Sequence, residues 1–88
     1  MRAQRVDANQ RQVMQALRAI GADVLFIGHP VDLLVGYRGE NWLLEVKDGS
    51  KPPSARRLTK AQAPFVDTWR GRVAVVKSVD EAIKAISC

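Results

Sequence analysis

The chain has 88 residues, which is enough for one domain and too few for two, so we expect a single domain over residues 1–88. Hydrophobic residues make up 47% of it and charged residues 26%, a composition that argues against disorder and is typical of a compact α/β domain. Fourteen Lys and Arg against nine Asp and Glu give a formal charge of +5, which favours a polyanionic partner such as nucleic acid. A merely basic protein without such a partner is the alternative that charge alone leaves open.

Several classes of protein are excluded by what the sequence lacks. The single cysteine, Cys88, allows neither an internal disulfide framework nor a cysteine zinc site. The apolar core of a signal peptide is absent, and no apolar run reaches membrane-spanning length. There is no nucleoside triphosphate loop, nucleophilic triad or zinc motif. We therefore expect a soluble, cytoplasmic protein.

The first half of the chain predicts one helix followed by three strands. Asp7 and Gln10 have the spacing of a capping box, and apolar residues then recur at helical intervals up to Gly21. The short apolar run of residues 23–27 predicts a buried strand. Residues 32–37 and 42–47 predict a hairpin around a turn at residues 38–41.

The second half predicts a loop, a helix, a strand and a last helix. Residues 48–58 contain a glycine and two prolines and predict a basic surface loop. Thr59 and Gln62 form another capping box at the start of a helix that ends before Gly71. Residues 72–77 predict a strand, and Ser78 with Glu81 predicts the cap of the last helix. The expected order is αβββαβα.

The predicted hairpin contains three ionisable residues, Asp32, Glu45 and Lys47. Because strand side chains alternate between two faces, Glu45 and Lys47 point the same way. If residues 38–41 form a four-residue turn, Tyr37 pairs with Trp42, and the register places Asp32 opposite Lys47 on the same face as Glu45. A turn shifted by one residue would separate Asp32 from the other two, so the register decides whether the three groups converge.

Three converging ionisable groups within apolar strands are costly unless they bind a ligand, such as a cation that bridges the carboxylates. Asp32, Glu45 and the Val46 carbonyl are oxygen ligands that suit Mg²⁺ or Mn²⁺. Such a metal would activate water and neutralise charge on a phosphate, while Lys47 would orient the water or stabilise the transition state. The alternative is a solvent-facing pair of Glu45 and Lys47, with Asp32 capping the loop after Pro30.

The pattern PVDLLVG at residues 30–36 and LLEVK at residues 43–47, between a leading and a trailing helix, resembles that of the PD-(D/E)XK nuclease superfamily. The chain looks most like the small stand-alone VRR-NUC-type members from phages and bacteria, which are similar to Holliday-junction resolvases. The likeness spans roughly residues 6–86 and implies a restriction-endonuclease-like core, a mixed central sheet flanked by helices. It also implies that Asp32 is the first acid of the motif, Glu45 the second and Lys47 its lysine.

Two departures from the family pattern concern the metal site. A valine separates Pro30 from Asp32, where the family usually has proline directly before the aspartate. Many relatives carry a glutamate on the first helix as an additional metal ligand, and Gln10 stands at the corresponding place. Its amide could hold a metal-bound water, with weaker ligation than a carboxylate, or could serve only in the capping box with Asp7.

Further residues are assigned by the resemblance and by position. Gln62 matches a glutamine that relatives place near the phosphate or the attacking water, and its alternative role is the Thr59 capping box. Trp42 and Trp69 could stack on bases, but we expect them in the core or in a dimer contact. Four cations on the loop after the Lys47 strand are expected to contact phosphates, namely Lys51, Arg56, Arg57 and Lys60.

We therefore expect a Mg²⁺- or Mn²⁺-dependent endonuclease that hydrolyses phosphodiester bonds, acts on branched DNA such as Holliday junctions and forms a homodimer. A small domain gains from oligomerisation because it buries additional apolar surface. The alternative is a catalytically weak or inactive nuclease-fold module that binds nucleic acid or serves in an assembly. The sequence leaves the choice between DNA and RNA open.

Overall fold

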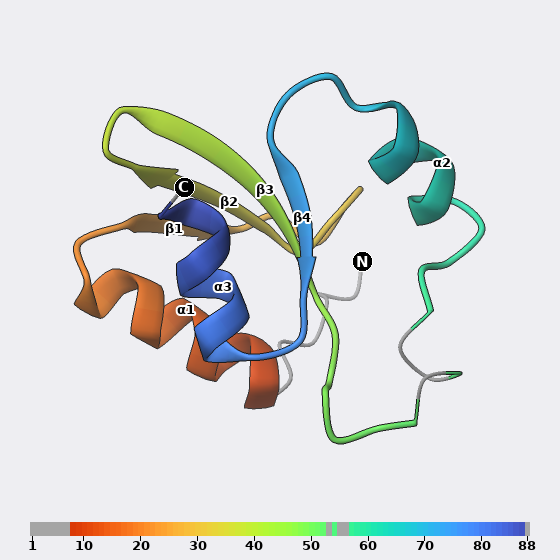
Figure 1. Ribbon diagram of the computed structural model, residues 1–88, viewed down its shortest axis with the longest axis horizontal. Helices are drawn as coiled ribbons and strands as arrows, with labels where there is room; N and C mark the ends of the chain where they lie inside the picture. Colours follow the sequence, from red (N-terminus) through yellow and green to blue (C-terminus); the bar gives the residue numbers. More distant parts are fainter. Residues whose placement is uncertain (1–7, 53, 55–56, 88) are drawn as a thin grey trace, which may run out of the picture.

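The computed structural model describes residues 8–52, 54 and 57–87. It consists of one sheet and three helices, in the predicted order αβββαβα (Figure 1). The helices are α1 (Ala8–Ala19), α2 (Gln62–Thr68) and α3 (Val79–Ile86), and the strands are β1 (Asp23–Phe26), β2 (Leu33–Tyr37), β3 (Glu40–Val46) and β4 (Val73–Val76). The predicted α/β class is confirmed.

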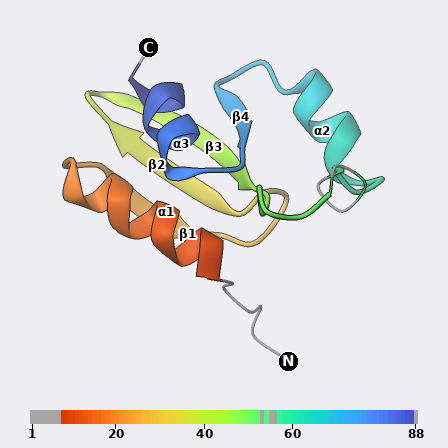
Figure 2. The same cartoon turned by 60° about the horizontal axis from the view of Figure 1, so that its bottom comes forward.

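The four strands form one mixed sheet in the order β1-β2-β3-β4. The first two pairings are antiparallel, and β3 pairs with β4 in parallel. Parallel neighbours need a long crossover, and the segment between β3 and β4, which includes α2, supplies it. Figures 1 and 2 both show α2 beyond β4, apart from the layer that α1 and α3 form. The end of β3 is therefore open toward the crossover loop.

The core lies between the α1 and α3 layer and one face of the sheet. Its members recur at three- and four-residue intervals on the helices and at every second residue on the strands, as burial of one face requires. They include Val13, Met14 and Leu17 of α1, Leu33 and Val35 of β2, Trp42, Leu44 and Val46 of β3, and Ala82 and Ile86 of α3. The opposite face of the sheet is left for polar and partly exposed residues.

The two tryptophans differ in their surroundings. Trp42 is 9% exposed and belongs to the core, as expected. Trp69 is 47% exposed, so of its two expected places the core was wrong, and the dimer contact stays a prediction. The physical reason is that α2 ends at Thr68, and the extended backbone at Trp69 (φ −65°, ψ 126°) takes this residue off the helix.

The turn between β2 and β3 is shorter than predicted. Only Arg38 and Gly39 form it, with φ of 52° and 80°, the left-handed conformation that matches the twist of a two-residue hairpin. Tyr37 therefore pairs with Glu40, not with Trp42, and continuing this register places Asp32 opposite Glu45, not opposite Lys47. The predicted register was wrong by two residues. Because a shift of two leaves every side chain on its face, the three ionisable residues still share one side.

The predicted cap at Ser78 is confirmed, and the two bonds of the Thr59 and Gln62 box are present, although α2 begins only at Gln62, with Ala61 as its N-cap. The Ser78 side chain accepts a hydrogen bond from the Glu81 N–H at 3.1 Å. The Thr59 hydroxyl accepts from the Gln62 N–H at 3.1 Å, and the Gln62 amide oxygen accepts from the Thr59 N–H at 3.2 Å. Asp7 lies outside the described residues, so the first capping box stays a prediction.

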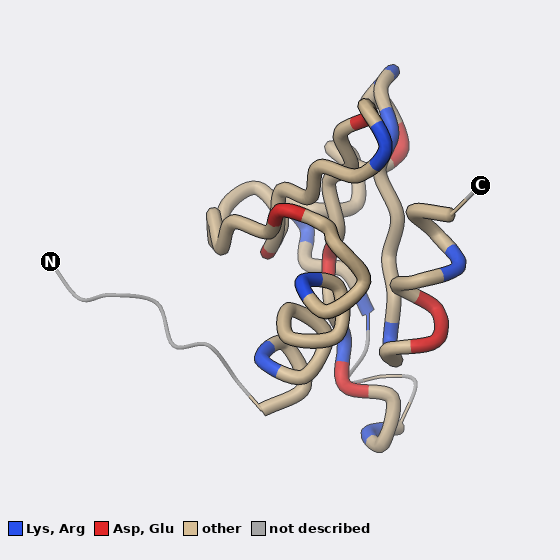
Figure 3. Tube along the Cα trace, turned by 90° about the vertical axis from the view of Figure 1, so that its left-hand side faces the viewer, with Lys and Arg blue, Asp and Glu red and all other residues tan. Residues whose placement is uncertain are grey.

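Charged residues are distributed over the whole chain. Figure 3 shows Lys and Arg on helices, strand ends and loops, with Asp and Glu between them. Across the part of the chain that the structure describes, no helix is both long and apolar enough to cross a membrane.

Candidate active site

Asp32 is held just before β2 by hydrogen bonds to its main chain and its side chain. The loop after β1 closes on it, because the N–H groups of Ile27 and Gly28 both donate to the Asp32 carbonyl, at 2.8 and 3.1 Å. Gly28 has a φ of 74°, which glycine adopts without steric cost. On the sheet side, Asp32 Oδ2 accepts from the Val46 N–H at 2.8 Å. These bonds fix the carboxylate at the end of β3.

The residue inserted between Pro30 and the aspartate is accommodated in the interior. Val31 is fully buried. The departure from the usual proline-aspartate spacing therefore adds an apolar anchor to the loop and leaves Asp32 at the end of the hairpin.

Glu45 and Lys47 form an ion pair on one face of β3, with 3.2 Å between Lys47 Nζ and Glu45 Oε2. Their side chains are only 5% and 16% exposed, so the solvent-facing pair that was the alternative is not what the structure shows. Glu45 Oε1 is buried and has no hydrogen-bond partner. A buried carboxylate oxygen without a partner is costly, which indicates that a ligand belongs beside it.

The pKa of Glu45 lies above its ordinary value. Burial is the largest cause, because it disfavours the charged form, and the negative charge of Asp32 acts in the same direction. The side chains of Lys47 and Gln62 lower the pKa without outweighing these two causes. Asp32 and Glu45 are therefore close enough to repel each other, and a cation between them would oppose both effects.

Gln62 connects the start of α2 to the site. Its Oε1 accepts from Lys47 Nζ at 3.4 Å and also from the Thr59 N–H in the capping box. The contact with Thr59 is the one that the sequence offered as the alternative role, and the contact with Lys47 places the same side chain beside the predicted catalytic lysine. Any movement of the first turn of α2 would change the surroundings of the Lys47 ammonium.

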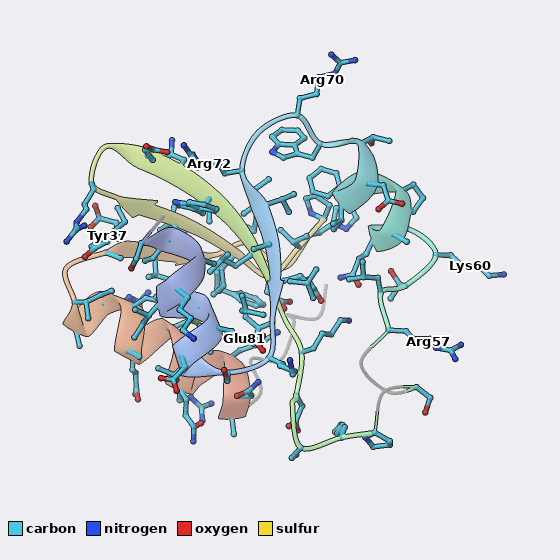
Figure 4. All side chains as sticks on the ribbon, viewed as in Figure 1. Tyr37, Arg57, Lys60, Arg70, Arg72 and Glu81 are labelled. Carbon is cyan, nitrogen blue, oxygen red and sulfur yellow. The ribbon has the colours of Figure 1, made fainter. Side chains whose placement is uncertain are left out.

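The contact between Lys47 and Gln62 joins the two ends of the loop at residues 48–61. The described residues of this loop contain neither an α-helix nor a β-strand, and it extends three residues beyond the predicted range of 48–58 because α2 begins only at Gln62. Lys51, Arg57 and Lys60 are exposed on it, and Figure 4 shows Arg57 and Lys60 pointing away from the rest of the protein. Arg56 lies outside the described residues. The loop therefore begins and ends at the site and carries its cations outward.

The first turn of α1 approaches the site from the helix layer. Asn9 Nδ2 donates to the Lys47 carbonyl at 2.7 Å, a contact that sequence reasoning missed. Asparagine near a helix start predicts a local cap, so nothing in the pattern pointed to a partner 38 residues away. Gln10 is buried on the same face of α1 as Val13 and Met14, and it has an interaction partner inside the protein.

Oxygen atoms dominate the possible ligands at this place. No cluster of three or more His, Cys, Asp and Glu side chains occurs among the described residues, so the acidic ligands of the site are the pair Asp32 and Glu45. The N–H and C=O of one strand residue point to the same edge, so the Val46 carbonyl faces the edge where its N–H meets Asp32. Two carboxylates with a carbonyl suit a hard cation better than a soft one.

Substituting Glu45 by Gln should stabilise the metal-free protein at neutral pH. The charge of a buried carboxylate with an unpaired oxygen is removed while its shape is kept, which we expect to contribute about 1 kcal/mol. For a domain of this size, that corresponds to a rise in Tm of roughly 4–8 °C. Thermal unfolding followed by circular dichroism in EDTA measures it, and Asp67→Asn, at an exposed position of α2, is the matched control.

The difference in stability between wild type and Glu45→Gln should depend on pH with a definite sign. A carboxyl group whose pKa is raised by folding contributes stability below its unfolded-state pKa, near 4.5, and loses that contribution as pH rises through the folded-state pKa. The wild type should therefore lose stability relative to the variant as pH increases above 4.5. A constant difference over this interval would contradict the raised pKa.

Comparison with protein-family models and with curated proteins finds no match. Among solved structures, the chain is similar to one described as a VRR_NUC domain, with a TM-score of 0.68 and 26% sequence identity. The similarity covers 97% of this chain and 97% of the other, so it extends over nearly the whole fold. The fold implied by the resemblance is confirmed, and the similarity to a VRR_NUC domain supports the family to which the motif pointed.

Proposed function

We propose that this chain, which has the fold of VRR-NUC nuclease domains, is a metal-dependent endonuclease that hydrolyses phosphodiester bonds in nucleic acid. The observation that carries the proposal is the convergence of two buried carboxylates and a mostly buried lysine at the end of β3. Such a cluster is costly for folding, and a site for a cation and a phosphate accounts for it. The formal charge of +5 suits a polyanionic substrate.

Asp32, Glu45 and the Val46 carbonyl are the groups that would hold Mg²⁺ or Mn²⁺. The fit is supported by the partnerless Glu45 Oε1 and by the repulsion between the two carboxylates. When bound, the cation supplies positive charge beside the scissile phosphate and makes nearby water more acidic. By the resemblance, Gln10 corresponds to a glutamate of many relatives, and we assign its amide a weaker role, through a water molecule.

Lys47 and Gln62 complete the proposed catalytic set. An ammonium group has three N–H donors, of which Glu45 and Gln62 orient two. The third is available for a phosphate oxygen or for the attacking water. Lys47 would thus stabilise the negative charge that develops on the phosphate, and Gln62 would hold the ammonium in position.

A cleavage assay tests the proposed function. Linear, flapped and four-way DNA, and RNA of the same sequence, are incubated with the protein in Mg²⁺, Mn²⁺ or EDTA. We expect cleavage with either metal, none in EDTA and the highest rate on branched DNA. Equal rates on linear duplex would remove the selectivity for branches, and a lack of cleavage on every substrate with both metals would contradict the nuclease proposal.

A symmetric homodimer is proposed together with selectivity for Holliday junctions and other branches. A domain with a radius of gyration of 12.4 Å has little surface with which to contact two arms of a junction, whereas two copies place one site at each of two strands. We expect sedimentation at micromolar concentration to give twice the chain mass of 9.7 kDa, and cleavage to occur as paired, symmetric cuts. A monomer that cuts four-way junctions symmetrically would contradict the dimer.

The cations of the loop at residues 48–61 are proposed to bind phosphates, and Lys51, Arg57 and Lys60 are exposed there. Replacing them by Gln should weaken binding to all sequences alike. Every phosphate that is no longer neutralised should reduce the slope of log K against log salt by about 0.9 on duplex DNA. Fluorescence anisotropy at several salt concentrations measures the slope. Arg11→Gln, at an exposed position of α1, is the control. A slope in the loop variants equal to that of the wild type would show that these cations contact solvent and not phosphates.

The second candidate function is a nuclease-fold module that binds nucleic acid or serves in an assembly without cutting. The neutral Gln10 favours it, as does the lack of a third acidic or His ligand beside Asp32 and Glu45 in the described part of the chain. Salt-dependent binding without cleavage in Mn²⁺ would support the binding module. Absence of binding at every salt concentration would support the assembly subunit.

A further inference from the structure

An apolar trough lies on the sheet face that carries Asp32 and Glu45, and the proposed chemistry does not use it. Its volume is about 540 Å³, within the range of small-molecule pockets. Its floor and walls are mainly apolar and aromatic, with polar groups at one end. The residues on which its chemistry depends are Leu34, Leu43, Phe65, Trp69, Asn41 and Arg72.

One end of the trough adjoins the carboxylates. Leu34 and Leu43 are directly paired, and each lies two residues from an acid, Leu34 from Asp32 and Leu43 from Glu45. Residues two apart share a face of the sheet and are separated by about 7 Å. Pro30, on the loop that positions Asp32, lines the same pocket. A group attached to a phosphate at the acids would therefore reach into the trough.

The aromatic wall of the trough is exposed and held in position. Phe65 and Trp69 stack with their ring centroids 5.2 Å apart, and Trp69 remains 47% exposed. The indole lies against Gly71, where a Cβ atom would come within 2.7 Å of Trp69 Nε1. Glycine at this position therefore leaves room for the ring. An exposed, oriented indole beside a pocket is suited to stacking on a flat ligand.

The far end of the trough is polar and positively charged. The Arg72 guanidinium lies over the Trp42 ring, 4.9 Å from its centroid, and pairs with Glu40. Arg70 follows Trp69 directly, and Figure 4 shows its side chain extending outward above the β4 edge. Asn41 adds an amide at the same end. The charge of Arg72 is matched by Glu40, so the exposed Arg70, just outside the trough, is the cation that suits a phosphate of a strand continuing past it.

We propose that the trough binds an unpaired nucleobase of the substrate strand, adjacent to the phosphate at Asp32 and Glu45. This inference rests on the proposed function, since it places the substrate by its phosphate. A nucleobase has apolar faces and polar edges, which match the aromatic wall, the leucine floor and the polar end. A base stacked inside a duplex cannot enter, so the trough selects strands that are open beside the cut and is indifferent to their sequence.

Binding with Ca²⁺ in place of Mg²⁺ tests the trough without involving cleavage. Labelled flapped DNA with either a normal or an abasic nucleotide at each position beside the branch is titrated by fluorescence anisotropy. For the wild type we expect the normal strand to bind roughly tenfold to a hundredfold more tightly at one position, the effect of losing one base–aromatic stack. The ratio of the two affinities, normal strand over abasic strand, should fall to about one in Trp69→Ala and persist in Trp69→Phe.

A control and a second variant separate this site from general effects. Leu25 is paired with Leu34 on the same face of the sheet and is 60% exposed, but it lies outside the trough, so Leu25→Ala should keep the wild-type ratio. Gly71→Ala should displace the indole and lower the ratio, with Tm measured to confirm folding. Base-dependent quenching of tryptophan emission should fall strongly in Trp69→Phe, leaving only the contribution of Trp42, which also lines the trough but is 9% exposed.

The outcomes distinguish this proposal from the proposed function. A base-dependent ratio with no cleavage in Mg²⁺ would support the trough and contradict the nuclease. Cleavage with an equal ratio in wild type and Trp69→Ala would contradict the trough and keep the nuclease. A Trp69→Ala protein that sediments as a smaller species and keeps the wild-type ratio would show that the trough is a contact between copies of the chain, and the base site would be wrong.

Discussion

Asp32→Asn and Glu45→Gln should each lower the rate of Mg²⁺-dependent cleavage by at least about a thousandfold. Each substitution keeps the shape of the side chain and removes the negative charge that would hold the cation, whose contribution to the barrier is several kcal/mol. Single-turnover cleavage of a flapped DNA at saturating enzyme measures the rate. Binding to the same DNA in Ca²⁺ should change much less, because the loop cations are intact.

The choice of Asn at position 32 follows from the structure. Asp32 Oδ2 accepts the Val46 N–H, and the amide oxygen of Asn can do the same. Alanine would leave that buried N–H without a partner, at a cost of about 1–3 kcal/mol, and would confuse loss of folding with loss of chemistry. Asp67→Asn on α2 is the control and should cleave at the wild-type rate. A variant at position 32 or 45 with full Mg²⁺-dependent turnover would remove that residue from the site.

Lys47→Met should lower kcat by roughly 10²- to 10³-fold, the usual effect of removing one donor that stabilises transition-state charge. The flexible apolar stem is kept, so the packing around β3 should persist. Lys47 also lowers the pKa of Glu45, so its loss should raise that pKa further and move the acid limb of the pH–rate profile to higher pH. A merely structural lysine would leave the profile where it is.

Lys77→Met is the matched control for Lys47. Lys77 is exposed, and its ammonium pairs with Glu81 of α3 rather than with Glu45. We expect its substitution to leave both kcat and the pH profile unchanged. Retention of wild-type kcat by Lys47→Met at pH 7 would exclude Lys47 from catalysis and leave it as a counterion for Glu45.

Local periodicity was sufficient to predict the elements of this fold and part of the site. Alternation along β3 separates Glu45 and Lys47 from the core residues on either side of them, whatever the hairpin register. The register itself depended on Arg38 adopting a positive φ, which is uncommon for arginine, so the sequence favoured a longer turn. The predicted register was wrong by two residues, and because a shift by an even number keeps every side chain on its face, Asp32 stayed on the side of Glu45.

Contacts between distant segments could not be predicted in the same way. The bond from Asn9 to the Lys47 carbonyl and that from Val46 to Asp32 depend on where helix and strands meet in space. Trp69 was expected in the core or in a dimer contact, but the helix ends one residue earlier and leaves it exposed. Burial of Glu45 together with an unpaired oxygen is likewise a property of the folded arrangement, and it is the feature that most directly indicates a ligand.

The contact between Lys47 and Gln62 closes the loop at residues 48–61 onto the site, and this has a consequence for how such a domain can diversify. Once the two ends of a loop are joined, doubling its length costs only about 0.6 kcal/mol of closure entropy. Insertions, deletions or transplanted segments can therefore be accepted there while the carboxylates and the lysine stay in place. The surface beside the carboxylates can in this way change through the exchange of a single segment, so this loop is the place where an engineered insertion should disturb the fold least.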